Sequence, residues 1–299
     1  MSGVAPWDAI PVEVFDTTRC ELGEGCGYDL DTDTVWWFDI LGRKLFQGHF
    51  SSRRLLCHDL PVMGSAGAFI DDNRQLIASD QGLHVRERAS GQLSFLRPIE
   101  PDKPGNRSND GRAHPCGAFW IGTMGRNAER GAGAIYHFHR GELGRLYAGI
   151  SIPNAICFSP DGTTAYFADT RAGILNRVAI DPATALPTST PQMLHDHRSD
   201  IGGLDGGIVD AEGLIWIACW GGGCIQAYTP DGLRVRNIPV PAKQPSCPVF
   251  VGPDLEQLIV TSAFEGMDSS ARKVDPGHGQ TFLLTFSVRG LPGARCMFT

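Results

Sequence analysis

The sequence predicts an all-β protein, a six-bladed β-propeller with four-stranded blades. One layout recurs six times: a polar turn, then a short apolar or aromatic run that ends in a small or short polar residue. The runs end at residues 39, 79, 123, 169, 219 and 261, so consecutive repeats lie 40 to 50 residues apart. A repeat of this length, built from short strands, is typical of propeller blades. Six repeats fill the chain, and we therefore expect residues 1–299 to form a single propeller domain.

The composition also favours a turn-rich β-protein. The chain has 37 glycines and 20 prolines, only 20% charged residues, and 42% hydrophobic residues, which are enough to fill a core. The net charge is −7, and no basic stripe is present, so we expect no nucleic-acid partner. No apolar run reaches the length that a membrane span requires, so we expect no membrane partner. We expect a monomer or a weak dimer.

The cysteines indicate a reducing compartment. There are nine of them, an odd number, and no two form a CxxC pair. Scattered single thiols in a long chain are typical of intracellular proteins. The N-terminal residues show neither the basic region nor the apolar stretch of a signal peptide. We expect a cytoplasmic protein.

The strands can be assigned in chain order. Residues 10–16 alternate well enough for a strand but precede the first repeat. A terminal strand commonly completes the last blade of a propeller, which otherwise has an unpaired edge. We therefore assign 10–16 to the outer part of the sixth blade, where it closes the ring. Blade one begins at Glu24 and has later strands at 44–49 and 54–58.

The remaining blades follow with longer connections between them. Blade two covers about 61–98, blade three continues through 133–140, blade four runs from 152 to about 187, blade five extends to 240, and blade six starts near 245 and resumes at 281–288. We expect segments 99–108 and 188–204 to be polar loops at the rim of the channel. We expect 264–279 to be a long irregular excursion.

A ring of polar residues is predicted at the propeller axis. About fifteen residues before each run end lies a position on a first strand, and first strands line the central channel. These positions hold Glu24, the Gly64-Ser65 pair, Asn109, Asn154, Asp205 and the Ser246-Cys247 pair. Oxygen ligands suit Ca²⁺ or Mg²⁺ and tolerate Mn²⁺ or Zn²⁺. One such residue could merely hydrogen-bond to the backbone beside a turn. Four in register, Glu24, Asn109, Asn154 and Asp205, favour a metal site.

Eight short motifs occur in a fixed order along nearly the whole chain. They are ELGEG at 21–25, NDGR at 109–112, FWIGTM at 119–124, IPN at 152–154, LDG at 204–206, DAEG at 210–213, WGGG at 220–223 and GPDL at 252–255. In this combination the chain resembles the regucalcin/gluconolactonase family of six-bladed propellers. The resemblance implies a hydrolase of cyclic carboxylic esters that converts a sugar lactone to its aldonic acid.

The resemblance also implies roles for particular residues. One divalent metal is expected on the propeller axis, with Glu24, Asn154 and Asp205 as its ligands. Arg107 and Asn109 match positions that contact substrate in the family.

The chain departs from the family pattern at three positions. Some relatives carry an acidic substrate contact just after Gly-Thr-Met, and here that position is Asn127. Cys26 stands where the family usually has proline, and Arg112 stands where it has lysine.

Lactone hydrolysis needs a polarised carbonyl and an activated water. A metal held by two carboxylates and one amide, with open positions, can supply both. Asp205 can act as the general base, or a hydroxide on the metal can be the nucleophile, and the sequence leaves both open. Serine catalysis is not indicated, because Gly64-Ser65-Ala66-Gly67 lacks the spacing of a nucleophile elbow.

Two other functional classes remain beside the lactonase. One is an esterase or phosphotriesterase at the same metal, and the other is a non-catalytic calcium-binding protein. Arg107 and Asn109, as polar contacts beside an ion with open positions, favour an enzyme that acts on small polyhydroxylated substrates.

A few histidines and tryptophans could also suggest a ligand site. His195 and His197 could form a zinc pair, but in a polar loop we expect them to be solvated. Trp37, Trp120 and Trp216 are expected in the core between blades. Trp220 is equally consistent with the core and with the pocket.

Overall fold

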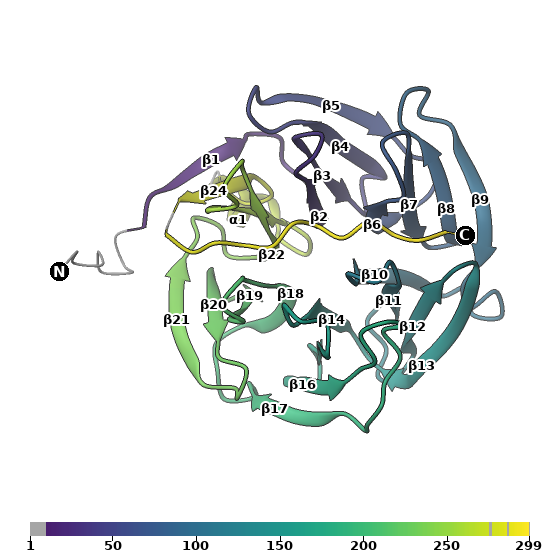
Figure 1. The fold of residues 1–299 in the computed structure, drawn as a ribbon. Helices are drawn as coiled ribbons and strands as arrows, with labels where there is room; N and C mark the ends of the chain where they lie inside the picture. The colour runs from purple at the N-terminus through teal and green to yellow at the C-terminus, as the bar shows by residue number, and fades with distance from the viewer. Residues whose placement is uncertain (1–9, 275–276, 286, 299) are drawn as a thin grey trace.

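The computed structural model describes residues 10–274, 277–285 and 287–298. Within these residues, six antiparallel sheets of four strands each are arranged in a ring (Figure 1). The predicted six-bladed β-propeller is therefore confirmed. The six apolar runs that defined the repeat form the second strands of the six blades.

The strands follow one another from the axis outward in each blade. Blades one to three consist of β2 (Gly23–Asp29), β3 (Thr34–Asp39), β4 (Lys44–His49), β5 (Arg54–Asp59), β6 (Gly64–Phe69), β7 (Arg74–Ser79), β8 (Gly82–Glu87), β9 (Leu93–Pro98), β10 (Asn106–Ala113), β11 (Phe119–Gly125), β12 (Gly133–His139) and β13 (Glu142–Ile150). Blades four and five consist of β14 (Pro153–Phe158), β15 (Thr164–Asp169), β16 (Ile174–Ala179), β17 (Gln192–Asp196), β18 (Gly203–Val209), β19 (Ile215–Trp220), β20 (Cys224–Tyr228) and β21 (Arg234–Pro239).

Blade six combines the first strand of the chain with the last three strands. Its sheet contains β22 (Pro245–Val251), β23 (Gln257–Ser262), β24 (Thr281–Thr285) and, on the outer edge, β1 (Val12–Asp16). In the register of the two outer strands, Val12 lies opposite Leu284 and Glu13 opposite Leu283. The prediction that an N-terminal strand closes the ring is confirmed, and Figure 1 shows β1 beside β24.

The core lies between neighbouring blades. Trp37, Trp120 and Trp216 are fully buried, as expected for inter-blade residues. The indole N–H of Trp120 donates to the Ala185 carbonyl at 3.0 Å, and that of Trp216 donates to Asp210 at 2.8 Å. These hydrogen bonds satisfy buried donors that would otherwise destabilise the fold.

In blades one and four, the aspartate at the end of the second strand accepts hydrogen bonds from the backbone just before the first strand. Asp39 accepts hydrogen bonds from the backbone N–H groups of Glu21 and Leu22, both at 3.0 Å. Asp169 does the same for Ser151 at 3.0 Å and Ile152 at 3.2 Å. This arrangement fixes the point at which each of these first strands enters the channel.

All six first strands contain an irregularity at the same level. The register between first and second strand shifts at 24–27, 64–66, 108–111, 154–157, 204–207 and 245–248. Bulges of this kind re-aim side chains and are common beside active sites. Glu24 and Asn154 begin such a shift, and Asn109 and Asp205 lie inside one. The shifts therefore occur at the four polar positions of the predicted ring.

The bulge in β2 depends on a glycine. Gly25 has a φ of +59°, and a Cβ added there would lie 2.0 Å from the Ser65 carbonyl oxygen. We expect Gly25→Ala to lower the free energy of unfolding by more than about 2 kcal/mol, because a left-handed residue and a backbone clash coincide. The measurement is denaturant unfolding beside a Gly144→Ala control, whose added Cβ has open space. Equal stability of the two variants would contradict this role of Gly25.

The C-terminal residues cross one face of the ring, which the sequence did not predict. Figure 1 shows this segment, in yellow, running across the propeller from blade six toward blades two and three. Backbone N–H groups of Cys296 and Met297 donate to the carbonyls of Phe69 and Gly117, at 2.7 and 2.8 Å. Arg295 forms ion pairs with Asp29 at 3.0 Å and Asp72 at 2.8 Å. The segment thus ties blades one, two and three to the end of the chain.

Three segments that were expected to be loops contain regular structure. Segment 188–204 was expected to be a rim loop, but it includes β17, the outer strand of blade four, in which His195 lies opposite Leu175. The expectation failed because an outer strand faces solvent and lacks an apolar run. The excursion 264–279 contains a short helix, α1 (Ser269–Val274), which buries none of its residues. Arg107, expected in a loop, lies on β10.

No helix among the described residues is long and apolar enough to cross a membrane.

Candidate functional site

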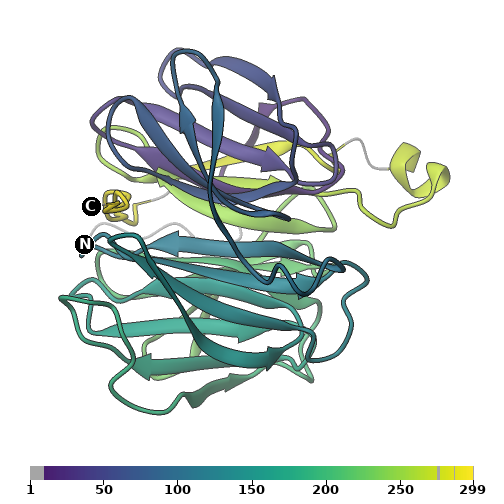
Figure 2. The ribbon, with the colours of Figure 1, turned by 90° about the vertical axis from the view of Figure 1, so that its right-hand side faces the viewer.

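A pocket of about 340 Å³ lies where the first strands of several blades converge. All six residues that the sequence analysis proposed for the site line it: Glu24, Arg107, Asn109, Asn127, Asn154 and Asp205. Glu265, from the excursion that carries α1, also lines it, so the pocket opens on the side of α1. Figure 2 shows α1 and the C-terminus on opposite sides of the propeller. This volume is in the range of small-molecule sites, whereas the cavity beneath the C-terminal segment measures about 110 Å³.

The four ring residues are held deep in the pocket. Glu24, Asn109, Asn154 and Asp205 come from β2, β10, β14 and β18 and are exposed to only 3–7%. A short polar side chain on a first strand faces the axis, and the bulge at its base sets the direction in which it points. Four separate strands therefore bring these side chains into one space.

A chain of hydrogen bonds orients the two amides. Arg107 Nη1 donates to Asn109 Oδ1 at 2.7 Å, and Asn109 Nδ2 donates to Asn154 Oδ1 at 2.8 Å. Asn154 Nδ2 in turn donates to Thr170 Oγ1 at 2.8 Å, and the Thr170 hydroxyl donates to the Leu204 carbonyl at 2.5 Å. The chain leads from Arg107 to the residue immediately before Asp205. Each amide is thereby fixed with its oxygen on a defined side.

Glu24 and Asp205, two of the three carboxyl groups that line the pocket, are difficult to ionise together. Burial raises the pKa of Glu24, and the nearby Asp110 carboxyl raises it further. Burial also raises the pKa of Asp205, and the charge of Glu24 adds to this effect. The rise in the pKa of Glu24 is partly offset by the hydrogen bond from the Gly25 backbone N–H at 3.0 Å and by the charge of Arg107. A positive ion between the two carboxylates would relieve this repulsion.

The donor set fits a hard divalent cation. Glu24 and Asp205 offer carboxylate oxygens, and Asn154 Oδ1, which accepts one hydrogen bond, keeps a second lone pair. Two carboxylates and an amide oxygen are typical ligands of such ions. These three residues could therefore hold a cation, with Asn109 fixing the amide of Asn154.

The other residues singled out from the sequence lie in different surroundings. Asn127 is exposed at the pocket rim, where its side chain donates to Glu129 at 3.0 Å. Cys26 is buried in the channel wall, with its thiol donating to the Cys247 carbonyl at 3.0 Å. Arg112 lies outside the pocket and donates to the Ile156 carbonyl at 3.3 Å. The two departures from the family motif at Cys26 and Arg112 thus affect the wall of the channel more than its contents.

The pocket contains four polar or aromatic residues that the sequence analysis did not assign to it. They are Arg126, Thr170, Trp220 and Glu265. Trp220, for which core and pocket were equally expected, lines the pocket. Glu265 has a raised pKa because it is partly buried, and the charge of Arg107 opposes this rise. No repeat position could have indicated Glu265, because it follows the second strand in the irregular excursion.

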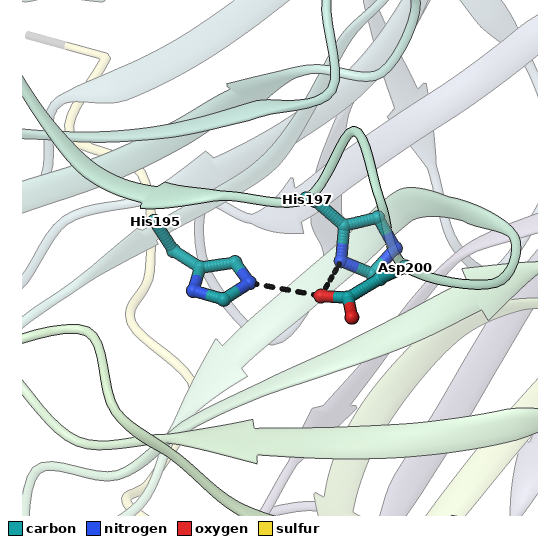
Figure 3. Close-up of side chains that lie close together, drawn as sticks. All are labelled: His195, His197 and Asp200. Carbon is teal, nitrogen blue, oxygen red and sulfur yellow. Dashed lines mark hydrogen bonds and ion pairs between the residues drawn. The ribbon is translucent and has the colours of Figure 1, made fainter.

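The expectation of solvated histidines is wrong for His197. This residue is only 2% exposed, and His195 is half-buried. Both rings approach the carboxylate of Asp200, as Figure 3 shows. The expectation failed because the segment packs against Tyr228 of the next blade, whose hydroxyl lies 3.3 Å from His197 Nδ1.

Taken together, the fold and the pocket define a six-bladed propeller with a polar, acidic site among its first strands. Residues 22–264 match the family model described as the SMP-30/Gluconolactonase/LRE-like region. The chain belongs to this family, as the order of its motifs predicted.

Individual relatives agree with this assignment. A Rhizobium meliloti protein with the provisional name sugar lactone lactonase is 57% identical over 270 residues, which are 90% of this chain and 92% of the relative. The L-arabinolactonase of Azospirillum brasilense is 33% identical over 284 residues, 93% of each chain. The crystal structure of the calcium-binding protein regucalcin from Agrobacterium tumefaciens is 50% identical, with a TM-score of 0.94 over 96% of this chain and 97% of that one.

Proposed function

We propose that this protein opens a sugar lactone to the aldonic acid in the pocket lined by Glu24 and Asp205. The observation that carries the proposal is the convergence of two carboxylates, two amides and one guanidinium from four blades on a single pocket. The prediction of a hydrolase of cyclic carboxylic esters is confirmed by the lactonase relatives.

We assign the cation to Glu24, Asn154 and Asp205. Held by these residues, a divalent ion would provide Lewis-acid chemistry toward the lactone carbonyl. The hydrogen-bond chain holds the amide oxygen of Asn154 toward Asn109 and its amide nitrogen toward Thr170, so the amide has one fixed orientation in the pocket. Because Glu24 and Asp205 are buried, their charge interactions are screened less than they would be in bulk water.

Asp205 is the candidate general base. In this role its carboxylate takes the proton of the water that attacks the carbonyl carbon. The C–O bond of the ring then breaks, and the ring oxygen leaves as a hydroxyl by taking the proton from Asp205. The aldonic acid ionises at neutral pH, so each turnover releases one proton to the solvent.

Arg107 and Asn109 are proposed to hold the hydroxyl groups of the sugar ring. Both line the pocket, and Arg107 is 7% exposed, so its contacts with substrate would be well desolvated. Its Nη1 donates hydrogen bonds to Asn109 Oδ1 and the Ser108 carbonyl, and these bonds fix the orientation of the guanidinium. Asn127, at the rim, would contact the part of the substrate nearest to solvent.

We expect Arg107→Ala to raise KM about 10-fold or more with a smaller change in kcat. A hydrogen bond from a charged donor contributes about 1.5–3 kcal/mol, and this contact would exist in the ground state and in the transition state alike. The measurement is steady-state kinetics on the best lactone. Arg145→Ala, at an exposed arginine of the same blade, is the control. A fall in kcat with an unchanged KM would contradict a role in ground-state binding.

The competing functions can be separated with a panel of substrates. The panel contains aldonolactones with five- and six-membered rings, an aryl ester and a phosphotriester, each assayed with and without a chelator. We expect turnover of lactones above the other two classes, because the pocket offers amide and guanidinium donors for a polyol. Preference for the phosphotriester would favour the esterase alternative. Cation binding without any turnover would favour a calcium-binding role, which the name of the Agrobacterium tumefaciens structure states for that protein.

A further inference from the structure

A second cluster of metal-type ligands lies where blade four leads into blade five. His195 is on β17, and His197 and Asp200 follow in the connection to β18 (Figure 3). Asp200 Oδ2 lies 3.1 Å from His195 Nε2 and 3.3 Å from His197 Nδ1. In the described part of the chain these are the three residues of this kind whose ligand atoms all lie within 4.8 Å of one another. None of them lines the pocket of Glu24 and Asp205.

Two of the three separations between the ligand atoms fit a tetrahedral zinc site. Zinc binds histidine nitrogen and carboxylate oxygen at about 2.0–2.2 Å, so tetrahedral ligands lie about 3.3–3.5 Å apart. The separations from Asp200 Oδ2, 3.1 Å to His195 Nε2 and 3.3 Å to His197 Nδ1, are close to this value. Two imidazoles and one carboxylate also suit zinc better than calcium, which prefers oxygen ligands alone.

The groups around the cluster hold the ligands in place. Arg234 Nη1 contacts Asp200 Oδ1 at 3.0 Å, which leaves Oδ2 facing the histidines. Tyr228 packs against the His195 ring at a centroid distance of 4.8 Å. Its hydroxyl donates to Gln226 Oε1 at 2.6 Å, so the oxygen keeps a lone pair near His197 Nδ1. Such outer contacts are typical of metal sites, although the charge of Arg234 would weaken binding of a cation.

The surroundings of His197 Nε2 are consistent with Nδ1 of the same ring as the metal ligand. Nε2 is buried and makes no well-formed hydrogen bond to any residue that the structure describes. Burial lowers the pKa of this ring, and the backbone of Gly202 opposes this change, so the Gly202 carbonyl is the group toward which an Nε2–H would point. That tautomer leaves the lone pair of Nδ1 facing the carboxylate of Asp200. A cation between the two would make this contact favourable.

We infer that His195, His197 and Asp200 form a second cation site, for Zn²⁺, whose fourth position is taken by the Tyr228 hydroxyl oxygen or by water. The ion joins the end of β17 to the connection that leads into β18. Asp200 lies five residues before Asp205, so an ion bound at this site would also restrain the strand that carries the proposed base. Three protein ligands and one exchangeable position are sufficient for zinc.

The test uses Co²⁺ as a spectroscopic substitute for Zn²⁺ in protein without a histidine tag. Tetrahedral Co²⁺ with nitrogen ligands absorbs visible light far more strongly than Co²⁺ in an oxygen-rich, higher-coordinate site. We expect an intense visible spectrum in the parent, and displacement of that spectrum by Zn²⁺. Glu24→Gln, which alters the other pocket, and His49→Gln, at an exposed histidine, should retain it.

His195→Gln and Asp200→Asn are the test variants. We expect both to lose the intense Co²⁺ spectrum, and their Zn²⁺ affinity to fall at least about 100-fold, since even outer partners of metal ligands change affinity about 10- to 100-fold. Thermal unfolding without metal checks that the variants fold, and His195 is only partly buried. An intense spectrum that persists in both variants would overturn the site. Its absence in the parent would likewise overturn it, and the cluster would then be a hydrogen-bonded network alone. Lactone turnover does not enter this readout, so either proposal can fail separately.

Discussion

Asp205→Asn is expected to lower kcat by about 100-fold or more at saturating cation and lactone. Loss of a general base typically reduces the rate by a factor of about 10² to 10⁴. The asparagine keeps the shape and one oxygen of the side chain, so the pocket should remain intact. It removes the proton acceptor and one negative charge from a position that is 5% exposed.

The measurement for Asp205→Asn is initial velocity by proton release, over a range of cation concentrations. Saturating cation separates the loss of the base from a loss of metal affinity. Asp102→Asn, at an exposed aspartate in the loop before β10, is the matched control and should behave as the parent. A kcat for Asp205→Asn within a few-fold of the parent would rule out Asp205 as the base.

Glu24→Gln is expected to have opposite effects on cation binding and on the stability of the metal-free protein. Removing one of two carboxylates from a divalent site should weaken binding at least about 100-fold, as even outer partners of metal ligands change affinity about 10- to 100-fold. The same substitution removes one half of a buried pair of like charges, so without cation the variant should be the more stable protein.

The pH dependence of stability reports how unfavourable it is to ionise Glu24 in its buried position. Burial and Asp110 raise the pKa of Glu24 from 4.5 to about 8. A carboxyl group whose pKa is higher in the folded state favours folding when it is protonated, and this contribution is lost as the pH rises from about 4.5 through 8. The metal-free parent should therefore lose stability over this interval, and Glu24→Gln should lose less.

Chemical unfolding in the presence of a chelator, across this pH range, measures the effect, and calorimetry measures the cation affinity. Identical pH profiles for the parent and Glu24→Gln would contradict the raised pKa of Glu24. A cation affinity equal to that of the parent would remove Glu24 from the proposed ligand set.

Much of the fold could be predicted because each blade repeats the same local pattern. The apolar runs at the second strands are long enough to stand out, and Trp37, Trp120 and Trp216 occupy buried positions in them. The ring followed from the repeat, since Glu24 and Asp205 lie at matching distances before their runs. The bulges that aim these side chains were not predicted, because a bulge changes the pairing of strands without changing their composition.

The parts that were missed depend on contacts between segments distant in sequence. The C-terminal segment has no strand pattern, and its place is fixed by contacts such as Arg295 with Asp29 and Asp72. Glu265 reaches the pocket from an irregular excursion. The burial of His197 depends on Tyr228 of the neighbouring blade, so a polar sequence alone suggested a solvated loop.

The most direct test of the proposed lactonase is the initial rate of proton release from aldonolactones, corrected for spontaneous ring opening. The rate is measured on the metal-loaded protein, after removal of the metal with a chelator, and again after the cation is restored. We expect acceleration by the loaded protein, its loss on chelation and its return on reconstitution. Failure of the metal-loaded protein to accelerate the opening of any lactone in a broad panel would contradict the proposed function.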